Sequence, residues 1–237
     1  MEDVINPNND FEFTRIKANT PRPLQGGTYV AKLFNMDSPI IVQAPKCFSK
    51  KGIKETGSKV YCDLLFTDND KEFIDWLRNL EERVREIIIE NRELWFASDV
   101  TMDDIEYAWN DCVKEKGKGY LLKTFVEREK KKLALQVFND EEEEVDYKKI
   151  DNTNELINIL EIAQLKFSSD SFQITIYLRQ MMVFKKKEYF KKCLIKVGTN
   201  VDNKSLVNDK TASVDEDKEV KEVKEVKEVK EVKEVKE

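Results

Sequence analysis

A long amphipathic segment places the strongest restriction on how this chain can fold. Between residues 70 and 95, apolar side chains recur at steps of three and four, which puts them on one face of an α-helix. Asn69 and Glu72 have the N-x-x-E spacing of a helix start, and the helix would be roughly 35–40 Å long. The opposite face is charged, which fits a helix packed on its own domain as well as one that docks on a partner. The apolar positions are Phe73, Ile74, Trp76, Leu77, Leu80, Val84, Ile87, Ile88, Leu94 and Trp95.

Segments on either side of this helix have the period-two alternation of β-strands. One of them places Val60, Cys62, Leu64 and Phe66 on a single apolar face. A shorter helix is expected to begin near Thr101, where Thr-x-x-Asp resembles a capping box. The expected strands are residues 28–34, 39–43, 60–66, 120–126, 132–138, 159–167 and 172–184.

The last two expected strands would form a hairpin around residues 168–171. Apolar and polar residues alternate in the second of them, which is typical of an antiparallel sheet with one buried face. The pattern therefore predicts a mainly β fold with helices, of the α+β class. The residues expected to face inward are Phe172, Ile174, Ile176, Leu178, Met182 and Phe184, and those expected to face outward are Gln173, Thr175, Tyr177 and Arg179.

Composition divides the chain into three parts. Residues 1–22 are polar and rich in Asn, which predicts an N-terminal arm, and residues 23–197 are expected to form one folded domain. Residues 198–237 predict a disordered low-complexity tail, since Lys-Glu-Val triplets repeat from Lys218 to the end. A period of three drifts around a helix of 3.6 residues per turn, so the valines form no fixed apolar stripe and cannot bury a core.

The residues needed for common enzyme chemistry are missing from the sequence. The chain has no histidine, which removes the commonest general base and the commonest metal ligand. It also contains no phosphate-binding G-x-x-x-x-G-K-[ST] loop, and its four cysteines lack metal-ligand spacing. No apolar run is long enough to span a bilayer. We therefore expect a protein that is not an enzyme, with no cofactor, no metal and no membrane contact.

Basic and aromatic residues are interleaved in three clusters, at residues 46–61, 114–125 and 177–192. Single-stranded nucleic acid offers phosphates for cations and base faces for aromatic rings. A net charge of −6 does not exclude such a local basic face. The alternative is that the lysines are ordinary surface residues and the aromatic residues belong to the core. The residues predicted to bind nucleic acid are Lys46, Lys50, Lys51, Lys54, Lys59, Tyr61, Lys116, Lys118, Tyr120, Lys123, Phe125 and Arg179.

Several stretches between residues 21 and 184 resemble a family of uncharacterised proteins from large nucleocytoplasmic DNA viruses. They are Pro-Leu-Gln-Gly-Gly-Thr-Tyr at 23–29, Pro-Ile-Ile-Val-Gln-Ala-Pro-Lys at 39–46, Lys-Lys-Gly-Ile at 50–53, Lys-Val-Tyr-Cys-Asp-Leu-Leu-Phe at 59–66, Phe-Ile-Asp-Trp-Leu-Arg-Asn-Leu-Glu-Glu at 73–82, Leu-Trp-Phe at 94–96, Asp-Asp-Ile-Glu at 103–106, Ile-Leu-Glu-Ile at 159–162 and Leu-Arg-Gln-Met-Met-Val at 178–183.

The order of elements is also similar to that of the T7-phage-type single-stranded-DNA-binding proteins. The resemblance implies an OB-like antiparallel β-barrel with a long helix, at about residues 70–95, inserted between its early and late strands. The end of the chain departs from that pattern, because phage-type tails are acidic and close on an aromatic residue. Here the Lys-Glu-Val repeats are nearly balanced in charge and Glu237 is the final residue.

Together these patterns predict sequence-tolerant binding of single-stranded DNA in viral replication, recombination or repair. Expected partners are single-stranded DNA and replication proteins, with a homo-oligomer as a further option. The expected location is the host cytoplasm or a viral factory, with packaging in the virion also open. The alternative function is a virion structural or scaffold protein that uses the long helix as an assembly surface.

Overall fold

The computed structural model describes residues 4–8, 10–130, 132–185 and 194–195. The predicted tail, residues 198–237, lies outside these residues. The strands are β1 (Ile16–Ala18), β2 (Arg22–Leu24), β3 (Thr28–Asn35), β4 (Ile40–Thr56), β5 (Lys59–Thr67), β6 (Val113–Lys116), β7 (Gly119–Val126), β8 (Arg128–Glu129), β9 (Lys132–Leu133), β10 (Gln136–Asn139), β11 (Glu155–Ser168) and β12 (Ser171–Phe184). The helices are α1 (Lys71–Glu90), α2 (Arg92–Trp95) and α3 (Met102–Tyr107), and three 3₁₀ turns are η1 (Phe13–Arg15), η2 (Asp68–Asp70) and η3 (Tyr147–Lys149).

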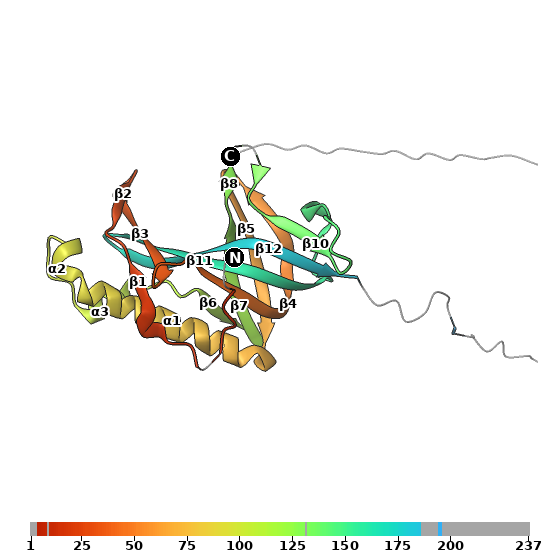
Figure 1. Cartoon of the computed structure of the whole chain (residues 1–237), viewed down its shortest axis with the longest axis horizontal. Helices are drawn as coiled ribbons and strands as arrows, with labels where there is room; N and C mark the ends of the chain where they lie inside the picture. Colours follow the sequence, from red (N-terminus) through yellow and green to blue (C-terminus); the bar gives the residue numbers. More distant parts are fainter. Residues whose placement is uncertain (1–3, 9, 131, 186–193, 196–237) are drawn as a thin grey trace, which may run out of the picture. The chain divides into compact units, whose positions relative to one another are not determined.

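Five strands close into a barrel in the order β4, β5, β7, β12 and β11, with β11 pairing back to β4 (Figure 1). All neighbours in this ring are antiparallel except β7 and β12, which run parallel and meet where Tyr177 pairs with Phe125. A five-stranded ring of this kind is the OB architecture. The expected OB-like barrel is therefore confirmed. Its inward residues include Val60, Cys62 and Leu64, as the alternation predicted.

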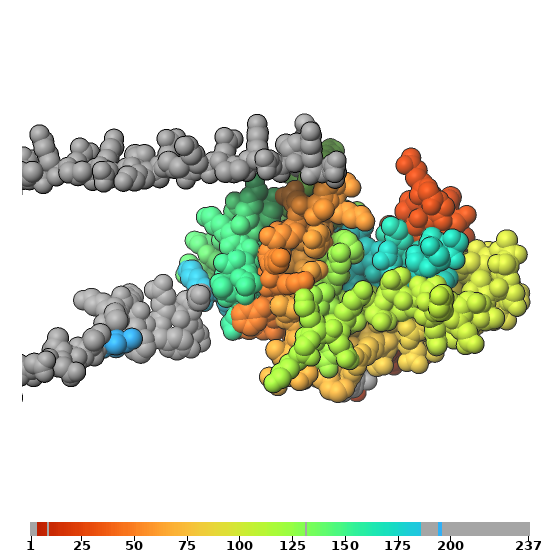
Figure 2. Space-filling view, turned by 180° about the vertical axis from the view of Figure 1, so that it is seen from behind, coloured from red at the N-terminus to blue at the C-terminus, as the bar shows by residue number. Residues whose placement is uncertain are grey.

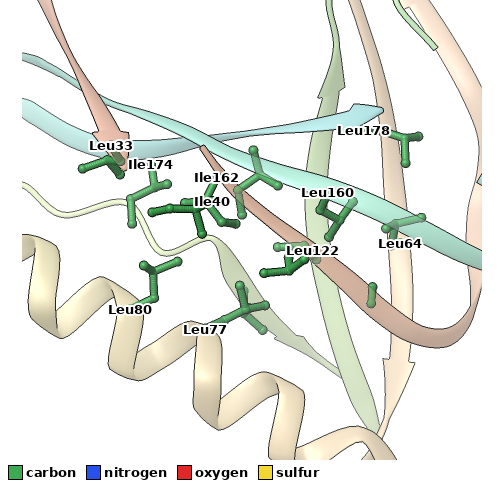
Figure 3. Packing of buried hydrophobic residues seen from close by; sticks show 14 of the residues in the cluster. Leu33, Ile40, Leu64, Leu77, Leu80, Leu122, Leu160, Ile162, Ile174 and Leu178 are labelled. Carbon is green, nitrogen blue, oxygen red and sulfur yellow. The ribbon is translucent and has the colours of Figure 1, made fainter. Parts of the chain in front are cut away.

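Helix α1 covers one end of the barrel and confirms the long inserted helix (Figure 1). Figure 3 shows Leu77 and Leu80 on the side of the helix that faces Leu122 and Ile162 of the barrel. All four side chains are fully buried. Burying a side chain of this size stabilises a fold by about 1.5–3 kcal/mol, so this contact is a major part of the core.

The two ends of α1 differ from the sequence prediction. The capping box at its start is formed by Thr67 and Asp70, on the preceding turn η2, rather than by the predicted N-x-x-E pair. At the other end the helix stops at Asn91, whose side-chain amide donates to the carbonyl oxygen of Ile87 at 2.8 Å. The chain then restarts as α2. This break leaves Leu94 84% exposed, so its predicted place on the apolar face was wrong.

The segment expected to be an N-terminal arm packs against the domain where it is described. Ile16 of β1 is completely buried, and both β1 and β2 pair with β3. The rings of Phe11 and Phe13 lie 5.3 and 5.6 Å from the ring of Trp76 on α1. These aromatic contacts fix the segment on the helix.

Two predicted strands are irregular in the structure, and in β12 the irregularity changes which residues face inward. The register of β12 shifts at Arg179, because Leu160 pairs with Leu178 while Ile159 pairs with Gln180. A bulge of this kind reverses the alternation beyond it. Met181 is therefore buried instead of Met182. The single strand predicted at 132–138 is divided into β9 and β10.

Candidate nucleic-acid interface

Three aromatic side chains stand side by side on the outer surface of the barrel. Tyr61 of β5 pairs with Phe125 of β7, and Phe125 pairs in turn with Tyr177 of β12. Their neighbours along each strand are buried, so strand alternation turns these three side chains outward. Each of the three is half-buried. Adjacent strands lie about 4.8 Å apart, which places three aromatic side chains in one row; we call Tyr61, Phe125 and Tyr177 the aromatic row.

Lysine side chains extend over and beside this row. The Nζ atom of Lys123 lies 4.6 Å from the ring centroid of Tyr61 and 5.6 Å from that of Phe125. Lys54 pairs with Tyr61 from the neighbouring strand β4. Both lysines are exposed. A cation over a ring face is held there by a weak attraction, and its ammonium group can still contact a phosphate.

A second group of lysines converges near Asp63, next to the row. The ammonium groups of Lys50 and Lys51 on β4 approach that of Lys116 on β6. The proximity of Lys50 lowers the pKa of Lys116, Lys51 adds to the effect, and Asp63 partly opposes it. The repulsion between like charges at this site is relieved when an anion binds beside them. We call Lys50, Lys51 and Lys116 the lysine cluster.

A bulge in β4 brings two of these lysines to the cluster. The sequence predicted a lysine-rich stretch after a short strand, but β4 continues through it to Thr56, with a register shift between Ser49 and Ile53. Gly52 sits in the bulge with a φ of 67°, and a Cβ atom there would lie 2.1 Å from the carbonyl oxygen of Ile150. The buried Ser49 hydroxyl donates to the carbonyl oxygen of Asp151 at 2.9 Å and accepts from the Gly52 N–H at 3.0 Å. The hydrogen bonds of the buried Ser49 side chain thus hold the bulge in place.

Arg179 lies at the far end of the row and has a different environment from the lysines. Its guanidinium lies 4.9 Å from the ring centroid of Tyr177. It donates to the carboxylate of Glu127 at 2.9 Å and also pairs with Glu161. Two carboxylates therefore balance its charge, and the structure places Arg179 as a support for Tyr177 rather than as a free cation.

The remaining predicted residues lie in separate places. Lys59 is exposed at the start of β5, and Lys118 is exposed in the turn between β6 and β7. Lys46 pairs with Glu155 at 3.2 Å and lies 4.2 Å from the ring centroid of Phe184, which puts it on the β11 side of β4. Tyr120 faces the opposite side of β7 from Phe125, packs against the core and lies 5.7 Å from the guanidinium of Arg78 on α1. The structure does not bring Lys46 or Tyr120 to the aromatic row.

Tyr177 belongs to the row but was absent from the predicted binding residues. Its outward direction was readable from the alternation of its strand. Its position beside Phe125 was not, because that depends on the parallel contact between β7 and β12. The basic and aromatic residues between 186 and 192 that extended the third predicted cluster lie outside the described residues.

Figure 2 shows the side of the molecule on which the orange surface of β4 and β5 lies beside the yellow-green surface of β6 and β7. In the part of the chain that the structure describes, no group of three or more His, Cys, Asp or Glu side chains could hold a metal ion. Of the helices in those residues, α1 included, none has the apolar length that a membrane crossing requires.

The chain matches no protein-family model and no curated protein. Solved structures with a similar arrangement include gp2.5, a single-stranded-DNA-binding protein encoded by bacteriophage T7, at 12% identity over 65% of this chain and 91% of that one, with a TM-score of 0.43. The single-stranded-DNA-binding protein from bacteriophage Enc34 is similar at 13% identity over 76% and 96%, with a TM-score of 0.41. The same Enc34 protein in complex with single-stranded DNA gives a TM-score of 0.40 at 11% identity over 71% and 96%. Similarity at this level assigns no activity to this chain.

Proposed function

We propose that this protein binds single-stranded DNA, with little dependence on sequence, across the outer face of β4, β5, β7 and β12. The observation that carries the proposal is the register of Tyr61, Phe125 and Tyr177, which places three outward-facing aromatic residues next to one another on adjacent strands. Aromatic faces stack on any base, because every base has a π-face, and each stacked base contributes about 1–3 kcal/mol. Duplex DNA keeps its base faces stacked inside, so the row favours single strands.

The positive charges beside the row match the backbone of such a strand. Lys54 and Lys123 flank the rings, and the lysine cluster adds three more ammonium groups on the β6 side. Neutralising phosphates with these groups releases counterions, which makes affinity fall with salt. The surface that flanks strands two and three of an OB barrel, here β5 and β7, is a common place for oligonucleotides to bind.

The expected role in viral replication, recombination or repair is part of this proposal, as is the contact with replication proteins. The assembly-surface alternative gains no specific support from the exposed face of α1. Lys71 on that face pairs with Asp75, four residues further along the helix, at 2.6 Å. Charges paired within one helix are typical of a face that meets solvent.

The test measures binding of the full chain to a labelled thymidine oligonucleotide of about 16 nucleotides and to a matched duplex. Fluorescence anisotropy is recorded from about 50 to 200 mM salt. We expect a clear preference for the single strand and a negative slope of log affinity against log salt. Absence of binding to the single strand at low salt would overturn the proposal.

A pair of lysine variants shows whether the proposed face carries the contact. Lys116→Ala removes one member of the lysine cluster and is expected to reduce the salt slope by about one. Lys32→Ala removes an exposed lysine of β3, away from the aromatic row, and serves as the matched control. Equal losses of affinity in the two variants would show that binding is spread over the whole surface rather than placed on this face.

A further inference from the structure

The five strands of the barrel are not joined equally firmly. β7 and β12, both described in full, meet at a single registered pair, Phe125 with Tyr177, whereas every other neighbouring pair in the ring forms a ladder of several pairs. One registered pair provides little backbone hydrogen bonding, so the seam between β7 and β12 depends on side chains more than the other seams do. The aromatic row crosses the barrel at this seam, because two of its members form that pair.

The side chain of Arg179 spans the seam. Arg179 is the bulge residue of β12, since its neighbours Leu178 and Gln180 pair with consecutive residues of β11 and leave it without a partner in the ladder. A bulge turns the side chain of the extra residue away from its regular direction. Here the guanidinium donates to the carboxylate of Glu127, the residue directly after β7, at 2.9 Å. One ion pair thus ties β12 to the end of β7.

The same guanidinium also holds the neighbouring strand and the ring. It pairs with Glu161 of β11, which is registered with Tyr177, and it lies 4.9 Å from the ring centroid of Tyr177. The planar, multiply donating guanidinium suits contact with two carboxylates at once. Arg179 therefore connects β7, β11 and β12 around this ring; we call Arg179, Glu127 and Glu161 the seam clasp.

We propose that the seam clasp holds Tyr177 in place beside Phe125, so that binding of a polyanion requires the carboxylate of Glu127. This inference rests on the proposed single-strand binding and adds positioning residues to it. The clasp acts through the ring of Tyr177 and not by touching the strand. Holding a binding group in place before the ligand arrives raises affinity, because the cost of ordering that group is no longer part of binding.

The effect of charge alone has the opposite sign. A carboxylate near a path of phosphates repels them, so its removal should strengthen binding. Removing Glu127 also leaves the charge of Arg179 less balanced, which should again favour a polyanion. The clasp predicts weaker binding instead, because the tie across the seam is lost. The sign of the change in affinity therefore decides between the two.

The experiment measures the affinity of the full chain for the thymidine oligonucleotide by fluorescence anisotropy. We expect Glu127→Ala to weaken binding by about threefold to tenfold, which is the cost of ordering one side chain. Glu129→Ala removes an exposed carboxylate of the nearby strand β8 and should leave affinity unchanged or slightly higher. Binding by Glu127→Ala that equals or exceeds that of the wild-type protein would overturn the clasp.

A second variant asks whether Arg179 contacts a phosphate. Arg179→Met should also weaken binding, with the salt slope unchanged, whereas loss of a phosphate contact would lower the slope by about one and overturn the proposal. Arg78→Met is the matched control, because Arg78 also pairs with a carboxylate, Glu115 at 3.0 Å, and lies 5.7 Å from the centroid of a tyrosine ring, that of Tyr120. It should leave affinity unchanged.

A double-mutant cycle tests whether the clasp acts through the ring. In a Tyr177→Ala background the ring is absent, so Glu127→Ala should cost no further affinity. Equal losses in the two backgrounds would overturn the proposal, because Glu127 would then act on the fold or the surface in general. Thermal denaturation checks that each variant is folded at the temperature of the measurement. Failure of the wild-type protein to bind any single strand removes the proposed function, whereas wild-type binding that Glu127→Ala leaves unchanged removes the clasp alone.

Discussion

Phe125 and Tyr120 lie on the same strand, β7, but belong to two different regions of the barrel. Both regions combine aromatic and basic side chains, and they differ in how exposed and how well paired those side chains are. On the outer face, Phe125 stands in a row of half-buried rings, and the nearby lysines are exposed. At the end covered by α1, Tyr120 packs against the core, and its neighbour Arg78 is paired with Glu115 at 3.0 Å. Satisfied charges and enclosed rings hold the barrel together, while rings and cations left open to solvent remain available to a ligand.

The buried carboxylate of Glu81 on α1 is a further example of a charge whose hydrogen-bonding partners lie inside the domain. It is 4% exposed and accepts from the Cys112 N–H at 2.7 Å and from the Trp109 Nε1–H at 3.2 Å. Burial raises the pKa of Glu81, although these two hydrogen bonds partly oppose the rise. Its role is to attach α1 to the segment between α3 and β6.

The largest expected effect comes from Gly52→Ala, which would break the bulge that presents Lys50 and Lys51. A methyl group meets the carbonyl oxygen of Ile150 and must also adopt a positive φ. We expect the free energy of unfolding to fall by about 2–4 kcal/mol and DNA affinity to fall with it. Chemical denaturation and anisotropy measure the two quantities.

Gly57→Ala is the matched control for this bulge variant. Gly57 also has a positive φ, of 59°, but a Cβ atom there would meet nothing within 4 Å. Only the backbone cost of placing an L-residue at a positive φ, about 1–2 kcal/mol, is expected. Equal destabilisation by the two substitutions would mean that the close approach to Ile150 does not hold the bulge.

The next effect compares the two sides of β7 directly. Phe125→Ala should weaken binding of single-stranded DNA by about 1–3 kcal/mol. Tyr120→Ala should leave affinity nearly unchanged and lower thermal stability instead, because its ring packs at the barrel end. Titration and thermal denaturation of both variants check this. If Tyr120→Ala weakens DNA binding as much as Phe125→Ala does, the two sides of the strand are not distinct in function.

The smallest effect is a change in pH dependence in Glu81→Gln. A carboxyl group whose pKa is raised by folding is protonated more readily in the folded state than in the unfolded state. Stability is then lost as pH rises from the ordinary Glu range up to the raised pKa of Glu81, by at most about 1.4 kcal/mol per pH unit. Glutamine keeps the acceptor oxygen without the charge.

Denaturation of both proteins from acid to neutral pH measures this contribution. Glu81→Gln should gain on the wild-type protein as pH rises through that window, with no further gain above it. A constant difference between the two proteins at every pH would show that the Glu81 carboxyl does not titrate differently on folding.

Local patterns predicted much of this fold, because they depend on neighbouring residues. The apolar steps of α1 and the alternation of β5 correspond to burial in the structure. The break at Asn91 and the bulge at Arg179 were not predicted. Each is stabilised by contacts of a single side chain, and the spacing of apolar residues along the sequence does not reveal such contacts. Most of the predicted lysines do lie on one face. The sequence could not show that Phe125 faces outward while Tyr120 packs against the core, because that depends on which side of β7 is enclosed.

The members of the aromatic row also come from distant parts of the chain. Tyr177 joins Tyr61 and Phe125 only when β12 pairs with β7, which is one of the contacts that close the barrel. A chain that has not reached this closure lacks the row, so a ligand of the row selects the native state. Saturation with such a ligand at a hundredfold excess over its dissociation constant would add about 2.7 kcal/mol to the unfolding free energy. A strand bound there therefore stabilises the closed barrel over forms in which β12 has not paired with β7.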